Sequence, residues 1–184
     1  MSKAVLISIR PTWVEKIANG EKTIEVRKTR PKLAPPFKAY IYCTMPDAKD
    51  PHNILELHGA DGKIRKANGK VIGEFTCKGF IPFSHGRPCF VTGTPEEIER
   101  MACLSCEEIW EYAPHGNPIG WRITDLVIYN TPRELTEFRM PCPNDLYCEA
   151  CAMYSNNGGI CNNGALPLRR APQSWCYVEA MKDG

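Results

Sequence analysis

Four cysteines near the C-terminus have the spacing of a metal site. They occur as Cys142-x5-Cys148-x2-Cys151-x9-Cys161, and a C-x2-C pair with two further thiolates can hold one tetrahedral zinc ion. The surrounding segment is rich in Cys, Asn and Gly and has few aliphatic residues, so it cannot build a hydrophobic core of its own. We therefore expect a structural zinc ion, with reduced thiols and an iron–sulfur cluster as the alternatives.

The remaining six cysteines give weaker indications. Cys103 and Cys106 form a second C-x2-C pair, which either joins Cys148 and Cys151 at a metal or packs in the fold without one. Cys89 has no assigned role. The other three fall in predicted strands and are expected to be core residues: Cys43, Cys77 and Cys176.

Positive charge is concentrated in the first 38 residues. This segment has nine basic and three acidic residues, a net charge of +6, although the whole chain has only +2. Such a local excess favours an anionic ligand such as phosphate, and the simpler interpretation is a solvated polar face.

Composition and the N-terminal residues indicate the class of protein. With 43% hydrophobic and 24% charged residues, the chain is too polar for a membrane protein. Its N-terminus lacks the apolar stretch of a secretory signal. We expect a cytoplasmic protein with reduced cysteines, built as one domain or one domain with an appendage.

Hydrophobic periodicity and turn residues predict short strands with few helices. Thr23, Glu25 and Arg27 share one face of a predicted strand, and Ile24 and Val26 share the other. Strands are expected over 4–9, 23–27, 38–44, 71–83, 120–129 and 173–179, and helices over 11–20 and after residues 94 and 105, with a helical turn from residue 131. Residues 45–70 are polar and turn-rich and form an excursion from the core. These elements indicate an α+β domain or a small β-rich barrel.

The N-terminal segment resembles a known family. From Gly20 to Arg27 the chain has the pattern G-x-K-x-x-E-x-R, which resembles the ASCH domain of the PUA-like superfamily. Later blocks at 71–75, 120–126 and 172–179 look like those of phage and prophage members. The resemblance implies an α+β fold, namely a small PUA-like β-barrel with short flanking helices and a Cys-rich C-terminal appendage.

The domain boundaries follow from this resemblance. The ASCH domain is expected over 1–140, including the excursion at 45–70. The expected zinc-binding segment covers 141–164, and a return strand within 165–184 completes the ASCH domain.

The resemblance also implies a cleft, lined by the motif, that binds RNA or nucleotides. Lys22 and Arg27 would meet phosphate or an electron-rich base edge, and Glu25 would accept hydrogen bonds from an exocyclic amine or act as a base. Further residues would extend the positive field or stack on a base: Arg10, Lys28, Trp13 and Trp121. The simpler interpretation of Glu25 and Arg27 is an ion pair on one strand face, worth under about 1 kcal/mol.

Two other functions stay open. The first is a hydrolase in the same cleft, either a ribonuclease or an amidohydrolase of the N4-acetylcytidine type, with Lys22 and Glu25 as catalytic residues. Family members that look like such amidohydrolases use a lysine, a threonine and a glutamate. Lys22 matches the lysine, Glu25 stands at the threonine position beside Thr23, and Glu99 is a rough match for the glutamate. The second is a protein-interaction module formed by the Cys-rich segment and the excursion.

Overall fold

The computed structural model describes residues 3–46, 51–59, 61–89, 93–114, 116–141 and 167–181. The strands are β1 (Lys3–Ile9), β2 (Ile24–Arg27), β3 (Phe37–Cys43), β4 (Glu56–His58), β5 (Ile64–Lys66), β6 (Val71–Ser84), β7 (Arg87–Pro88), β8 (Ile119–Arg133) and β9 (Trp175–Glu179). The helices are α1 (Pro11–Ala18), α2 (Pro95–Ala102) and α3 (Cys106–Tyr112), with a 3-10 turn, η1 (Leu135–Glu137).

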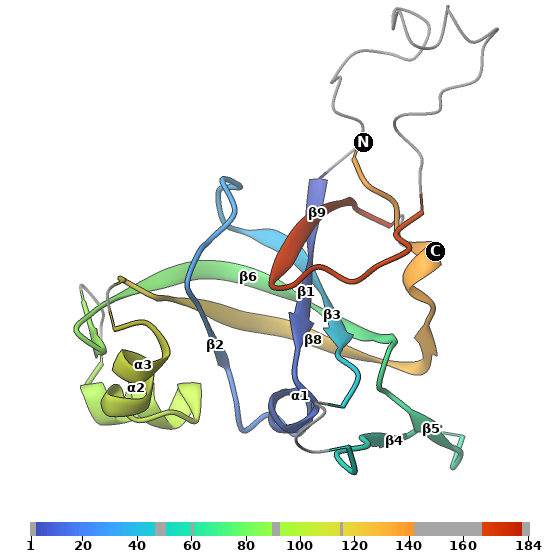
Figure 1. The fold of residues 1–184 in the computed structure, drawn as a ribbon, viewed down its shortest axis with the longest axis horizontal. Helices are drawn as coiled ribbons and strands as arrows, with labels where there is room; N and C mark the ends of the chain where they lie inside the picture. The colour runs from blue at the N-terminus through green and yellow to red at the C-terminus, as the bar shows by residue number, and fades with distance from the viewer. Residues whose placement is uncertain are drawn as a thin grey trace, which may run out of the picture.

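One mixed sheet organises these elements (Figure 1). Its order is β2-β8-β6-β3-β1-β9, with β7 paired to β6. β1 and β3 are parallel, and the other strand pairs of this sheet are antiparallel. The crossover from β1 to β3 contains α1 and β2, so the motif segment lies entirely within this connection.

The sheet is strongly coiled. β6 and β8 lie side by side, and β1 runs across their direction (Figure 1). The pairing of β6 with β8 shifts register at three places, and that of β3 with β6 shifts at one. Each irregularity bends a strand and increases its local twist, which brings the two edges of the sheet toward one another.

The core follows from the alternation of side chains along β1. Val5, Ile7 and Ile9 are fully buried on the face that α1 covers, where they join Val14 and Ile17 of that helix. α1 begins at a proline. The backbone N–H of the first helical residue has no acceptor within the helix, so a proline there costs no hydrogen bond. The helix therefore positions the chain that leads into β2.

The predicted β-barrel is not closed. The edge strands β2 and β9 form no strand pair in the described part of the chain. We call the line between them the seam. Two side-chain contacts bridge it: Trp175 Nε1 donates to Thr29 Oγ1 at 3.0 Å, and the backbone N–H of Lys32 donates to Tyr177 Oη at 2.8 Å. The predicted α+β class is confirmed, but the predicted closure of the sheet into a barrel is wrong.

Most predicted elements occur within a few residues of their expected bounds. Capping boxes at Thr94 and Ser105 begin α2 and α3, as predicted. The excursion contains the β4–β5 hairpin, and β9 returns to pair with β1. The helical turn expected from Thr131 begins later, at Leu135, because β8 extends to Arg133, which pairs with Val71 of β6 after a register shift.

The Cys-rich segment lies outside the described residues, with all four of its predicted zinc ligands, Cys142, Cys148, Cys151 and Cys161. Among the residues that are described, no group of metal-binding side chains occurs. Nor does any helix there have the length and apolarity needed to cross a bilayer. Cys43 and Cys77 are buried core residues, as predicted, and Cys176 is half-buried.

The close approach of β6 and β8 at Gly73 gives a stability prediction. A Cβ atom on Gly73 would lie 2.4 Å from the backbone oxygen of Val127. We expect Gly73→Ala to lower the free energy of unfolding by about 1–3 kcal/mol, as overpacking typically does. Gly79→Ala is the matched control, since its Cβ would meet its nearest neighbour at 4.0 Å. Urea unfolding measures both variants, and equal stabilities would contradict the close contact.

Candidate functional site

The charged cluster consists of Lys22, Glu25 and Arg27, which come from the turn after α1 and from β2. Gly20 has φ +77°, which glycine adopts without steric cost, and it lets the chain reverse after α1. Alternation along β2 then directs its two aliphatic side chains into the apolar cluster with α2 and α3. Glu25 and Arg27 share the opposite face, as predicted from the sequence. The helix α1 covers this face.

Lys22 is held by three different groups. Its ammonium donates to the backbone oxygen of Ala102, lies 3.6 Å from Glu25 Oε2, and stands 4.9 Å from the ring centre of Trp13. Ala102 is the last residue of α2, so its carbonyl lies at the negative end of the helix dipole. All three groups favour the charged form of the lysine.

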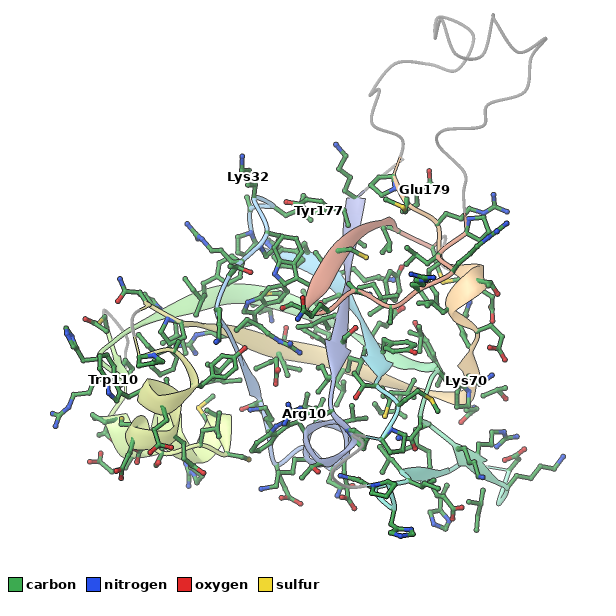
Figure 2. The ribbon with its side chains drawn as sticks, viewed as in Figure 1. Arg10, Lys32, Lys70, Trp110, Tyr177 and Glu179 are labelled. Atoms are coloured by element: carbon green, nitrogen blue, oxygen red, sulfur yellow. The ribbon has the colours of Figure 1, made fainter. Side chains whose placement is uncertain are left out.

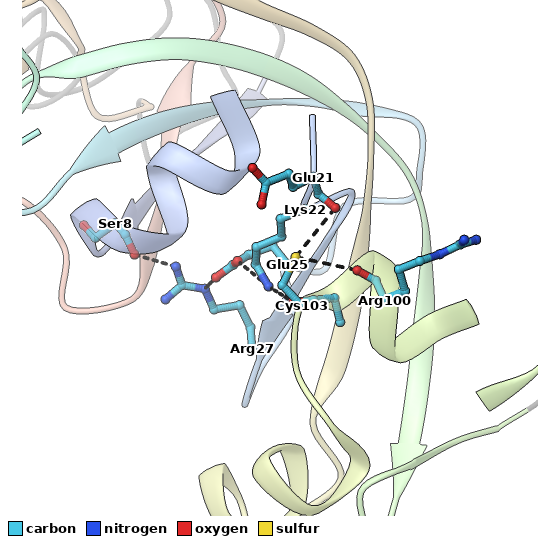
Figure 3. A network of polar contacts seen from close by, with 8 residues as sticks. Ser8, Glu21, Lys22, Glu25, Arg27, Arg100 and Cys103 are labelled. Atoms are coloured by element: carbon cyan, nitrogen blue, oxygen red, sulfur yellow. Dashed lines mark hydrogen bonds and ion pairs between the residues drawn. The ribbon is translucent and has the colours of Figure 1, made fainter. Parts of the chain in front are cut away.

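Glu25 joins the two cations of the cluster (Figure 3). Its Oε1 lies 3.1 Å from Arg27 Nε, and its other oxygen faces Lys22. The Arg27 Nη2 donates to the backbone oxygen of Ser8 in β1. The cluster therefore ties β2 to the end of α2 and, across the seam, to β1.

The cluster is buried rather than set in an open basic cleft. Lys22 is 2% exposed, Glu25 5% and Arg27 9%. Burial lowers the pKa of Lys22 below its usual 10.5 because it removes water from the ammonium, although Glu25 acts in the opposite direction. Lys22 therefore gives up its proton more readily than a surface lysine.

A pocket of about 480 Å³ lies between the turn before β2 and the end of α2, and Lys22 is not part of its lining. Its lining includes Thr23, Arg100 and Cys103. The Cys103 Sγ lies 3.6 Å from the backbone oxygens of Glu21 and Arg100, to which it donates (Figure 3). Cys103 occupies the left-handed C-cap of α2, and Cys106 begins α3. A metal shared by this C-x2-C pair with Cys148 and Cys151 stays a prediction, because Cys148 and Cys151 lie outside the described part of the chain.

The other predicted contact residues are spread around the cluster. Arg10 is exposed at the N-cap of α1, and Lys28 is exposed with its ammonium 4.9 Å from the ring centre of Tyr112. Trp13 is half-buried and packs against Lys22. Glu99 accepts a hydrogen bond from the backbone N–H of Cys106 at the start of α3.

Trp121 does not fit its predicted role of stacking on a base. Its side chain is fully buried, and it meets Phe37 and Phe80 edge-on at 5.8 Å between ring centres. In this conformation no face of the ring is open to a base. The hydrophobic environment of β8 explains its position, because a large apolar ring gains more from burial than from exposure.

Sequence reasoning missed the acceptors that complete the site. The backbone oxygens of Ser8 and Ala102 hold Arg27 and Lys22, respectively. Backbone carbonyls have no sequence signature, so only the three-dimensional arrangement identifies them. Cys103 was recognised as part of a C-x2-C pair, and that spacing gave no indication that it lies beside Lys22.

The lowered pKa of Lys22 predicts a pH-dependent stability. The native state releases this proton at a lower pH than the unfolded chain does, so the unfavourable burial of the charge disappears as pH rises toward 10.5. Relative to Lys22→Met, the wild type should therefore gain free energy of unfolding between pH 7 and pH 10. Urea unfolding checks this, with Lys63→Met as the exposed-lysine control. A difference that stays constant with pH would contradict the burial effect.

Comparison with known proteins gives a likeness of fold. The sequence matches no protein-family model and no curated protein. The solved structure of ASCH from Zymomonas mobilis is 16% identical, with a TM-score of 0.53, and the match covers 96% of this chain and 87% of that one. A tyrosine-to-phenylalanine variant of the same protein gives a TM-score of 0.53, with 97% and 91% covered.

A serine-to-alanine variant of that protein agrees with these values. It is 16% identical, has a TM-score of 0.55, and matches over 96% of this chain and 88% of that chain. The expected closeness to phage and prophage members stays a prediction. Because the likeness covers nearly the whole length of both chains, the protein described here has the fold of an ASCH domain protein.

Proposed function

We propose that this chain is an ASCH family protein that binds nucleotides or nucleic acid, with RNA preferred, at the charged cluster. The observation that carries the proposal is the burial of Lys22, Glu25 and Arg27 together at the seam. Burying an ion pair seldom stabilises a fold better than apolar residues of the same volume would. A functional role explains why three charges occupy this position, as perturbed groups often mark functional sites.

Exposed cations occur on the segments next to this cluster. Four of them lie on the segments that lead into or out of it: Arg10, Lys28, Arg30 and Lys32. Arg10 stands beside α1, two residues after the carbonyl that holds Arg27, and Lys32 lies on the loop beyond β2 near Tyr177 (Figure 2). Phosphates bind such exposed cations without sequence selectivity.

In the proposed recognition, the exposed cations and the buried charged cluster bind different parts of the ligand. The exposed cations attract and position the phosphate backbone, which needs no deep burial. The buried cluster lies behind them and has a fixed geometry, which suits it to one chemical group of the ligand. RNA is favoured because its single-stranded regions leave bases free to enter protein pockets.

Hydrolysis in the same site is the second candidate function. Because the pKa of Lys22 is lowered, a larger fraction of this side chain is unprotonated at a given pH than for a surface lysine, and only the unprotonated amine can accept a proton. With Glu25 Oε2 at 3.6 Å from its nitrogen, Lys22 could take the proton from a 2′-hydroxyl, as a ribonuclease requires, or from a water that attacks an amide. Both reactions use the catalytic pair expected from the sequence.

A structural zinc ion in the Cys-rich segment is a separate proposal. It rests on the spacing of Cys142, Cys148, Cys151 and Cys161, since these residues lie outside the described part of the chain. Zinc would hold a segment that lacks aliphatic residues. A third candidate function is a protein-interaction module, in which the Cys-rich segment and the excursion with its β4–β5 hairpin form the surface that contacts a partner.

Salt-dependent binding tests the proposed function. We expect a labelled single-stranded RNA to bind at low salt, with an affinity that falls as salt rises. Arg10→Ala combined with Lys28→Ala should weaken binding about three- to tenfold and lower the salt slope by about 1 to 2. Lys63→Ala with Lys66→Ala removes the same charge from the exposed hairpin and should change affinity less.

The same incubation separates a binding protein from an enzyme. Intact RNA and unchanged N4-acetylcytidine after incubation indicate binding alone. Product that Lys22→Ala abolishes supports a hydrolase in the cluster, whereas product that survives this change places the chemistry elsewhere. No binding of RNA, DNA or nucleotides at low salt would overturn the proposed function.

Metal analysis tests the zinc proposal. Freshly purified, reduced protein should contain zinc in a stoichiometric amount, and replacing Cys148 and Cys151 with serine should remove it. Cys89→Ser is the matched control, since Cys89 lies outside the four-cysteine spacing. Protein that carries no metal before any substitution contradicts the proposal.

A further inference from the structure

Two N–H donors beside the charged cluster have no acceptor among the described residues. They are Arg27 Nε and Trp121 Nε1, and both atoms are buried. Arg27 Nε is 3.1 Å from a Glu25 oxygen, but its N–H does not point at that oxygen, so the contact is an ion pair without this hydrogen bond. Buried donors are nearly always paired in native proteins, so each such exception needs an explanation.

The two donors share one face of the sheet. Glu25 is the register partner of Trp121, and directly paired residues project their side chains from the same face. Arg27 follows Glu25 by two residues, so its side chain also lies on that face. Trp121 and Arg27 are therefore diagonal neighbours on paired strands, a separation that long side chains can span.

The surroundings of these donors select the kind of acceptor. Three aromatic rings lie around Trp121, with ring centres 5.8 Å away for Phe37 and Phe80 and 6.2 Å away for Trp175. Glu25 already faces a cation with each of its oxygens. The groups left to bind a ligand are therefore the two N–H donors, which lie next to aromatic rings. An uncharged group with an oxygen acceptor complements these donors chemically, whereas a hydrated phosphate would lose its water there.

We infer that Arg27 Nε and Trp121 Nε1 bind a carbonyl oxygen of a nucleobase. This inference rests on the proposed function and specifies the part of the nucleotide that the buried site recognises. The exposed cations bind the phosphate, and the base enters at the seam. There, Trp175 is half-buried and donates its own N–H to Thr29.

Indole NMR provides a direct test. The chain has four tryptophans, and in ¹⁵N-labelled protein each gives a separate indole N–H signal, assigned with single Trp→Phe variants. Uridine 5′-monophosphate should move the Trp121 signal downfield and slow its hydrogen exchange, because the N–H gains an acceptor. Ribose 5-phosphate, which lacks the base, should leave it in place. The Trp110 signal is the internal control, since that residue lies on α3.

Affinity supplies the second measurement. Trp121→Phe keeps an aromatic ring but removes the donor, and it should weaken uridine 5′-monophosphate binding about fivefold, the usual loss for one hydrogen bond. Trp110→Phe should leave the affinity unchanged. If Trp121→Phe does not fold, the wild-type Trp121 signal, assigned by elimination with the other three variants, still decides the question.

The outcomes distinguish this inference from the proposed function. Binding of uridine 5′-monophosphate that leaves the Trp121 signal unmoved overturns the base-carbonyl contact and keeps nucleotide binding. A Trp121 signal that moves equally with ribose 5-phosphate assigns the donors to phosphate and also overturns it. If neither RNA nor any nucleotide binds, the proposed function fails as well.

Discussion

The position of Glu25 between two buried cations is the interaction on which this structure depends. Removing charges from water is costly, and their attraction compensates only when the geometry is good and the remaining hydrogen bonds are made. Here Lys22 and Arg27 each find a further backbone acceptor, Ala102 and Ser8. Deleting one partner of such a buried pair typically costs about 3–5 kcal/mol, because the remaining charges stay buried without compensation. The three residues therefore act as one unit that joins a strand, a helix end and the opposite edge of the sheet.

The seam determines how this unit is enclosed. A closed barrel would surround the cluster with a continuous ladder of backbone hydrogen bonds, and a ligand could enter only by breaking several of them at once. In this sheet β2 and β9 are joined instead by individual side-chain contacts, those of Trp175 with Thr29 and of Tyr177 with Lys32. Such contacts can open one at a time, since each contributes little to the free energy of the fold. The incomplete closure therefore leaves the cluster buried without surrounding it with a continuous ladder of backbone hydrogen bonds.

Local features were predictable from the sequence, and long-range ones were not. The alternation along β2 predicts that Glu25 and Arg27 share a face, and the capping boxes predict α2 and α3, because these signals lie within a few residues. The burial of the polar face could not be predicted, since its acceptors are backbone atoms 19 and 80 residues away. The same limit explains the error at Thr131, where pairing with β6 overrides a local helix-start pattern. It also explains Trp121, whose burial depends on rings from β3, β6 and β9.

The contact between Lys22 and the last carbonyl of α2 bears on how the site arises during folding. All three charged residues occur within six consecutive positions, yet a peptide of residues 1–44 would contain no part of α2. The lysine would then lack the backbone oxygen of Ala102 as its acceptor. The contact closes a loop of 80 residues, and long loops close late because their entropy cost must be met first. The segment from Gly20 to Arg27 therefore does not form the site by itself. The site is complete only when α2 has folded and its last carbonyl lies against Lys22.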